Sequence, residues 1–123
     1  MTRKEAFSDG AENWEVQLRK GSLELAILAS LWGGRLYGLE ILRRLENGSD
    51  LVVSEGTVYP LLNRLRLSGL VESEWVESGS GHPRKYYQLT AAGREQAAAM
   101  AQVWHRFAAS LTGLLAPLGK EKP

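Results

Sequence analysis

A helix predicted over residues 54–69 carries side chains that are suited to reading DNA. Asn63, Arg64 and Arg66 provide one amide and two guanidinium groups on this helix. A guanidinium bridges two acceptors on the major-groove edge of guanine, and an amide pairs with the matching edge of adenine. Residues of these types on an exposed helix face indicate contact with double-stranded DNA. The alternative is an ordinary surface helix with a solvated polar face.

The apolar spacing of this stretch predicts which face of the helix is buried. Ser54 is a suitable N-cap, and Gly69 is suited to end the helix in the left-handed conformation. The apolar stripe has the i, i+3, i+4, i+7 spacing of a buried face and consists of Val58, Leu61, Leu62 and Leu65. The opposite face contains no acid and consists of Gly56, Thr57, Tyr59, Pro60, Asn63, Arg64 and Arg66. Because Pro60 lacks an N–H inside the helix, we expect a distorted first turn over residues 54–59.

The composition is that of one small folded protein. The chain has 123 residues, of which 44% are apolar, and its net charge is +1. The absence of cysteine excludes disulfides and zinc–thiolate sites. No apolar run approaches the length of a membrane span, and no signal-peptide pattern is present, so we expect a cytoplasmic protein without membrane contact. The small net charge makes local basic patches the relevant test of nucleic-acid binding.

The first half of the chain is predicted to form a core helix and a helix-turn-helix. Residues 1–12 read as a flexible tail, and residues 13–20 as a short helix that Gly21 breaks. Ser22 then caps a helix that is apolar nearly all round, as is typical of a buried central helix. A second amphipathic helix over residues 37–46 precedes a short polar turn into the Ser54 helix, which matches a helix-turn-helix. The predicted inward residues of this second helix are Leu39, Ile41, Leu42 and Leu45.

A β-hairpin with a basic second strand follows the Ser54 helix. Residues 70–77 and 84–89 alternate between apolar and polar types, and a glycine-rich turn separates them. Arg84 and Lys85 open the second strand and are suited to contact phosphates, which position a protein on DNA. His82 in the turn is a candidate phosphate or minor-groove contact and lacks a second ligand at metal-binding spacing. These features indicate a wing; the alternative is a plain hairpin with solvated ends.

Three stretches carry a resemblance to a known family. They are LELAILASLWGGRLYGLEILRRLE, EGTVYPLLNRLRLSGLV and GHPRKYYQLTAAG. With these stretches in this order, the chain resembles the PadR family of winged-helix transcriptional regulators. The resemblance implies a dimeric bacterial or archaeal repressor that has one C-terminal helix and leaves DNA when an effector binds. The DNA contacts that it implies are Thr57, Tyr59, Pro60, Arg64, Arg84 and Lys85.

The expected fold is mainly α with a small β-hairpin, and it has four parts. They are a flexible tail (1–12), a winged helix-turn-helix with a leading short helix (13–89), a C-terminal dimerisation helix (90–116) and a second flexible tail (117–123). The predicted DNA contacts, from the exposed helix face and the wing, are Ser54, Gly56, Thr57, Tyr59, Pro60, Asn63, Arg64, His82, Arg84 and Lys85.

The C-terminal helix, which Thr90 is expected to cap, has the spacing of a coiled-coil seam. Its a and d positions are Ala97, Met100, Trp104, Phe107, Leu111 and Leu114. An exposed apolar seam of this length promotes aggregation of a monomer, so we predict a two-fold homodimer. The predicted interface also includes Trp14 and Leu18.

Trp104 allows two interpretations in such a dimer. Two indole rings that meet at the dimer axis can pack against each other as core. Alternatively, they can separate and stack a planar aromatic effector, with Met100 and Phe107 as further lining residues. The sequence leaves both alternatives open.

No constellation of residues points to catalysis. Neither histidine lies near a nucleophile in the sequence, and the phosphate-binding and zinc-protease motifs are absent. We therefore expect no enzyme activity, no metal and no cofactor. The predicted function is an effector-responsive repressor that binds a palindromic double-stranded DNA operator as a homodimer. The alternative is a winged-helix module whose partner is a protein.

Overall fold

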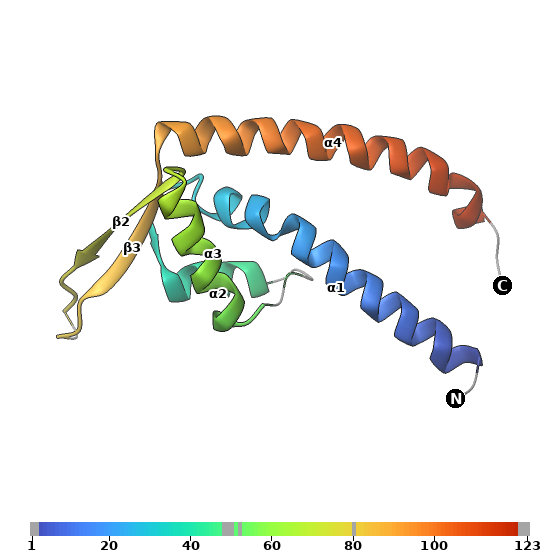
Figure 1. The fold of residues 1–123 in the computed structure, drawn as a ribbon, viewed down its shortest axis with the longest axis horizontal. Coiled ribbons are helices and arrows are strands. Elements are labelled where there is room, and N and C mark those ends of the chain that lie inside the picture. The colour runs from blue at the N-terminus through green and yellow to red at the C-terminus, as the bar shows by residue number, and fades with distance from the viewer. Residues whose placement is uncertain (1–2, 48–50, 52, 80, 121–123) are drawn as a thin grey trace.

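The computed structural model describes residues 3–47, 51, 53–79 and 81–120. These residues form four helices and a three-stranded antiparallel sheet (Figure 1). The elements in chain order are α1 (Arg3–Ser30), β1 (Leu36–Tyr37), α2 (Gly38–Glu46), α3 (Glu55–Leu67), β2 (Val71–Val76), β3 (Arg84–Leu89) and α4 (Ala91–Lys120). The predicted class, a winged helix-turn-helix followed by a long C-terminal helix, is confirmed.

The core lies where the second half of α1 meets α2, α3 and the sheet. Val58, Leu62 and Leu65 of α3 are buried as the spacing predicted, and Leu61 packs partly against them. The other buried apolar residues are Leu23, Ile27, Leu28, Leu31, Ile41, Leu42, Leu45, Val71, Tyr87 and Ala97. Full burial of an aliphatic side chain contributes about 1.5–3 kcal/mol, so the apolar stripe anchors α3 with its polar face outward. The inward prediction for Leu39 is wrong, because this side chain is exposed near the start of α2, next to the hairpin.

The sheet contains one strand that the sequence did not predict. The strand order is β1-β3-β2, and Leu36 of β1 pairs with Tyr87 of β3. A two-residue strand has too few positions to show a periodicity, so no pattern could reveal it. Tyr37 ends β1 and is also the N-cap of α2, where its N–H donates to Glu40 Oε1 at 3.0 Å. The sheet and the helix-turn-helix are therefore joined at Tyr37.

The helix α1 is continuous where we expected a tail, a short helix and a break. Gly21 lies inside this helix, and Ser22 Oγ donates to the Leu18 carbonyl at 2.9 Å instead of capping a new helix. A glycine in a helix interior costs about 1 kcal/mol, which is less than the burial of the apolar residues that follow it contributes. Residues 3–12, predicted to be flexible, belong to the same helix, whereas Met1 and Thr2 lie outside the described residues.

Two helices contain an internal proline without ending there. The helix α3 is continuous through Pro60, so the expected distorted first turn is not present as a separate element. The helix α4 continues through Pro117 to Lys120, beyond the predicted end at residue 116, and residues 121–123 lie outside the described part. In both cases the residue four positions earlier, whose carbonyl faces the proline ring, is a glycine, Gly56 or Gly113. Glycine backbone tolerates the adjustment that a proline ring requires.

The start of α4 is attached to the turn between α3 and β2. Thr90 Oγ1 donates to the Gly69 carbonyl at 2.6 Å and accepts the Gly93 N–H at 3.0 Å, which confirms Thr90 as the helix cap. Gly69 has a φ of +79°, the predicted left-handed conformation. A Cβ on Gly93 would lie 1.9 Å from the Leu70 carbonyl oxygen. This close backbone approach sets the direction in which α4 leaves the domain.

The first half of α1 and the second half of α4 project from the domain toward the two termini (Figure 1). The large exposed apolar residues of α1 and α4 are Trp14, Val16, Leu18, Val103, Trp104, Phe107, Leu114, Leu115 and Leu118. Ala97 differs from the other predicted interface residues, because it lies near the start of α4 and is buried in the core of its own chain. No helix in the described part of the chain is long and apolar enough to cross a membrane.

Candidate nucleic-acid interface

The face of α3 opposite the core carries the polar groups that the sequence placed there. The exposed residues are Gly56, Thr57, Tyr59, Pro60, Asn63, Arg64 and Arg66. Ser54 has the extended backbone of an N-cap, but its Oγ lies 3.2 Å from Thr57 Oγ1 and makes no capping bond to the backbone. Glu55 adds one exposed carboxylate in the first turn. The helix thus presents two hydroxyls at its positive end, where anions are stabilised.

The two arginines of α3 have different partners. Arg64 Nη2 lies 3.3 Å from Glu24 Oε2 of α1, and Arg66 Nη2 donates to Asn63 Oδ1 at 2.8 Å. The Arg64–Glu24 pair is largely exposed, so it contributes at most about 1 kcal/mol. A phosphate or a guanine can therefore displace Glu24 from Arg64 at small cost. No sequence pattern indicated this partner, because 40 residues separate Arg64 from Glu24.

Tyr59 of α3 lies where this helix meets α2 and the hairpin. Its ring packs on Gly38, where a Cβ would lie only 2.5 Å from Tyr59 Cε1. Burial, and then the Glu55 carboxylate, raise the pKa of Tyr59 above its usual 10.0, so the phenol stays protonated and can donate a hydrogen bond. An open recess of about 360 Å³ forms here, and its lining residues are Tyr37, Gly38, Leu39, Tyr59, Trp75, Lys85 and Tyr87.

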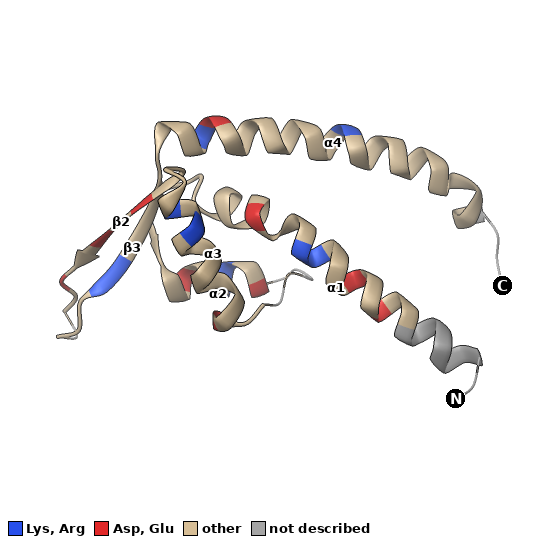
Figure 2. Ribbon diagram, viewed as in Figure 1, with Lys and Arg blue, Asp and Glu red and all other residues tan. Residues whose placement is uncertain are grey.

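The hairpin brings its predicted contact residues to the surface. His82 is exposed in the turn after Gly81, whose φ of +85° favours glycine. Lys85 Nζ lies 5.8 Å from the ring centroids of both Trp75 and Tyr87. The Arg84 guanidinium lies over a different ring, that of Tyr37 in β1. Figure 2 shows basic residues on α3 and at the start of β3, and acidic residues along β2.

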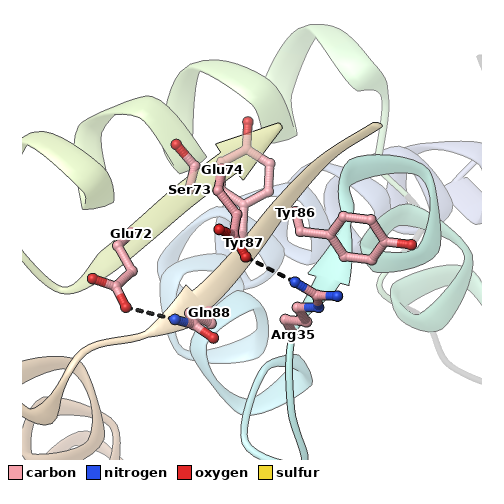
Figure 3. Close-up of a pocket in the computed structure, with 7 residues that line it drawn as sticks. All are labelled: Arg35, Glu72, Ser73, Glu74, Tyr86, Tyr87 and Gln88. Carbon is pink, nitrogen blue, oxygen red and sulfur yellow. Dashed lines mark hydrogen bonds and ion pairs between the residues drawn. The ribbon is translucent and has the colours of Figure 1, made fainter. Parts of the chain in front are cut away.

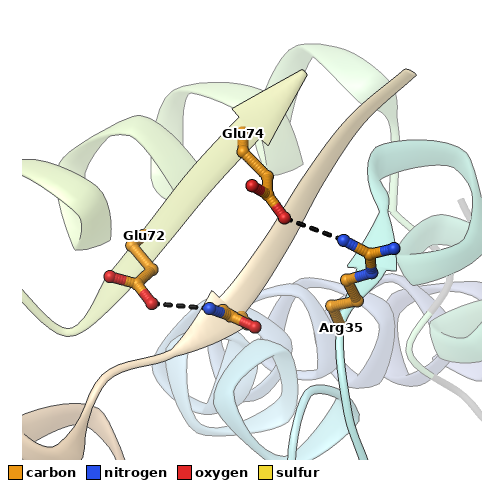
Figure 4. A network of polar contacts seen from close by, with 4 residues as sticks. Arg35, Glu72 and Glu74 are labelled. Atoms are coloured by element: carbon orange, nitrogen blue, oxygen red, sulfur yellow. Dashed lines mark hydrogen bonds and ion pairs between the residues drawn. The ribbon is translucent and has the colours of Figure 1, made fainter. Parts of the chain in front are cut away.

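The acidic residues of β2 lie on the sheet face away from α3. Glu74 Oε1 accepts a hydrogen bond from Arg35 Nη1 at 2.8 Å, and Glu72 Oε1 accepts one from Gln88 Nε2 at 2.6 Å (Figures 3 and 4). Tyr87, which has the opposite orientation in β3, is buried in the core. The strand carboxylates therefore have partners of their own and do not lie among the basic groups that face α3.

A second candidate site lies between α1 and α4, where Trp104 is part of the lining of two open apolar grooves. One groove, of about 620 Å³, includes Leu18, Leu25 and Trp104 in its lining. The other, of about 370 Å³, contains all three predicted effector residues, Met100, Trp104 and Phe107. Trp104 is half exposed, and its ring meets His105 edge-on at 5.4 Å between centroids. The geometry thus brings the predicted effector residues together on one open surface.

Residues 27–99 match the model of the transcriptional regulator PadR-like family. The chain belongs to the PadR-like family of transcriptional regulators. The crystal structure of a PadR family transcriptional regulator from Eggerthella lenta is similar to it, with 32% identity and a TM-score of 0.80 over 89% of this chain and 96% of that chain. A PadR-like transcriptional regulator from Bacillus cereus has 36% identity and a TM-score of 0.74 over 80% and 96%, respectively.

The PadR-like segment covers the domain that contains every predicted DNA contact. It begins in the second half of α1 and ends at residue 99 in the first turns of α4. Most of the predicted interface and effector residues, including Trp14, Trp104 and Phe107, lie outside it. The family match therefore concerns the DNA-binding fold, and the roles of the projecting helices depend on their own exposed surfaces.

The structure adds residues to this PadR-like surface that the sequence did not single out. Gly38 allows the Tyr59 ring to approach α2, and Trp75 lies directly across the ladder from Lys85. The strand alternation was a usable signal for Trp75, because it predicts which side chains share a face with Lys85. The role of Gly38 had no signal in the sequence, since the contact joins two helices.

Proposed function

We propose that this PadR-like regulator is a homodimeric repressor that binds a palindromic DNA operator and is released by a planar aromatic effector. The observation that carries the proposal is the exposed face of α3. This face holds amide, hydroxyl and guanidinium groups in place through the buried Val58, Leu62 and Leu65. The basic hairpin lies beside it, and the strand carboxylates point to the other side of the sheet.

The proposed contacts divide into those that read bases and those that bind phosphates. Asn63 and Arg64 have the geometry-specific donors that discriminate between base edges in the major groove. The hydroxyl groups near the start of α3 and the basic hairpin contact the DNA backbone, which positions the protein. The candidates for phosphate contact are Ser54, Thr57, Tyr59, His82, Arg84 and Lys85, and Gly56 and Pro60 let the DNA backbone approach α3 closely.

The proposed dimer follows from the apolar surfaces of the projecting helices. Trp14, Leu18, Trp104, Phe107 and Leu114 are all exposed in the single chain. Large apolar side chains left exposed on two neighbouring helices mark an interaction site in a folded protein. A two-fold dimer through these surfaces gives two α3 helices and two hairpins, which suits an operator with two related half-sites.

The proposed effector site uses the same region. A planar ligand that stacks on Trp104 and contacts Met100 and Phe107 alters how the two copies of α4 pack. Because the start of α4 is attached to the turn after α3, a change in helix packing moves the two DNA-binding domains relative to each other. A coupling free energy of about 1–3 kcal/mol lowers DNA affinity roughly 5- to 150-fold. The alternative, that Trp104 serves only as dimer core, predicts no such response.

The test is fluorescence anisotropy with DNA from immediately upstream of the gene for this protein. Scrambled DNA of equal length is the control, and both are titrated over a salt series with and without planar aromatic compounds. We expect tight binding that prefers the upstream DNA, weakens steeply with salt and is reduced by at least one compound in the wild type but not in Trp104→Ala. Equally weak binding to both DNAs and to a genomic fragment library would contradict the proposal and favour a protein partner.

A further inference from the structure

The neighbouring cations of the hairpin, Arg84 and Lys85, lie on opposite faces of the sheet. Successive side chains of a strand alternate between faces, and Lys85 pairs across the ladder with Trp75. The face of Lys85 also contains Val71 and Tyr87, which are buried in the core together with the apolar residues of α3. Lys85 is therefore on the side of the hairpin that faces α3, and Arg84 is on the other side.

The Lys85 ammonium group borders the recess between the hairpin and α3. Its Nζ lies 5.8 Å from the centroids of Trp75 and Tyr87, and the Tyr59 ring lines the same recess. An ammonium held over an aromatic face keeps its N–H donors available, because the attraction to the ring does not require them as hydrogen bonds. The recess is open, and Tyr59, whose phenol is a hydrogen-bond donor, is also part of its lining. Lys85 and Tyr59 together are suited to bind one backbone phosphate.

The Arg84 guanidinium group is part of a stack on the other face. Its Cζ lies 4.5 Å from the Tyr37 ring centroid, and Tyr37 meets Tyr86 edge-on at 5.6 Å. Arg35 lies over Tyr86 at 4.7 Å and forms the ion pair with Glu74. Because Tyr37 is also the N-cap of α2, this stack joins the hairpin to the helix-turn-helix.

We infer that Lys85 is the cation through which the hairpin binds a DNA phosphate, whereas Arg84 is a positioning residue that holds the hairpin against the helix-turn-helix through Tyr37. The inference rests on the proposed DNA-binding function and divides a role that the sequence assigned equally to both residues. It also adds Tyr37 and Trp75 to the residues on which hairpin contact with DNA depends.

The variants Arg84→Ala and Lys85→Ala form a matched pair, because each removes one positive charge from adjacent positions. The measurement is the dissociation constant for duplex DNA by fluorescence anisotropy at five or more salt concentrations. Lys85→Ala should reduce the slope of log affinity against log salt by about 0.9 for each DNA phosphate that the variant no longer neutralises. Arg84→Ala should weaken binding by about 2- to 5-fold at every salt concentration, with the wild-type slope retained.

Variants of Tyr37 test the positioning role separately. Tyr37→Leu should weaken binding at least as much as Arg84→Ala, because it also removes the contact with Tyr86. Adding Arg84→Ala to Tyr37→Leu should weaken binding no further, because the stack of Arg84 on Tyr37 is already lost. Tyr37→Phe keeps the ring and should bind like the wild type. Circular dichroism identifies any Tyr37 variant that fails to fold, and the test then rests on the salt slopes of Arg84→Ala and Lys85→Ala.

Two results would overturn the inference while the proposed function stands. One is an equal reduction of the salt slope in Arg84→Ala and Lys85→Ala, which makes both residues phosphate ligands. The other is an unchanged slope in Lys85→Ala while the wild type shows strong salt dependence. A wild type whose DNA binding does not respond to salt would instead overturn the proposed function itself.

Discussion

The DNA-binding domain and the helices that project from it differ in the exposure of their apolar side chains. In the domain, Leu62 and Ile27 are fully buried within one chain. On the projecting halves, Phe107 is 64% exposed and Leu114 is 76% exposed. The domain thus completes its core by itself, whereas the projecting helices have apolar faces that a single chain leaves in water. This difference separates a part whose core is completed within one chain from a part for which we propose a second copy as cover.

The largest effect is expected from a cavity in the domain. Leu62→Ala removes a fully buried side chain and should lower the free energy of unfolding by about 2–5 kcal/mol. Leu67→Ala, on the same helix but at an exposed position, should change it by less than about 0.5 kcal/mol. Urea titrations at two protein concentrations measure both values. A destabilisation of Leu62→Ala that disappears at high protein concentration would show that the domain core also depends on a partner.

An intermediate effect, on self-association, is expected from the exposed apolar face of α4. Phe107→Glu places a charge in the proposed interface and should weaken self-association by at least about 30-fold, equivalent to about 2 kcal/mol. Gln102→Glu adds the same charge to α4 outside the seam and should leave self-association unchanged. Light scattering over a dilution series measures both. A wild type that is monomeric at micromolar concentration would contradict the proposal that the projecting helices associate with a second copy of the chain.

A smaller effect is expected where the two regions join. Gly93→Ala forces the first turn of α4 away from the Leu70 carbonyl and should lower the free energy of unfolding by about 1–3 kcal/mol. Gly21→Ala, inside α1 with no atom near its missing Cβ, should leave stability unchanged or raise it by up to about 1 kcal/mol. Thermal unfolding compares the two. Equal stability of the two variants would mean that the close approach of Gly93 to the Leu70 carbonyl does not constrain the start of α4.

Much of the candidate site was predictable because it depends on local patterns. The stripe of Val58, Leu62 and Leu65 predicted which face of α3 is exposed, and the alternation of residues 84–89 predicted β3 with the observed bounds. The left-handed Gly69 and the Thr90 cap were also visible as local signals. Each of these features involves residues only a few positions apart, within one turn of a helix or along one strand.

The features that the sequence did not predict depend on packing between distant segments. The continuity of α1 through Gly21 contradicted the local signal, because packing of the following residues outweighs the helix cost of one glycine. The position of Ala97 in the core depended on α4 lying against α1.

The sequence by itself determined α2, α3, the two strands of the hairpin, the start of α4 and the polar face of α3, since periodicity and capping act within single elements. Only the tertiary structure decided which partners those groups have. It joined Arg64 to Glu24, the Tyr59 ring to Gly38 and Arg84 to Tyr37. The physical reason is that each of these pairs forms only after separate elements pack together, and the spacing of residues along the chain contains no direct record of that packing.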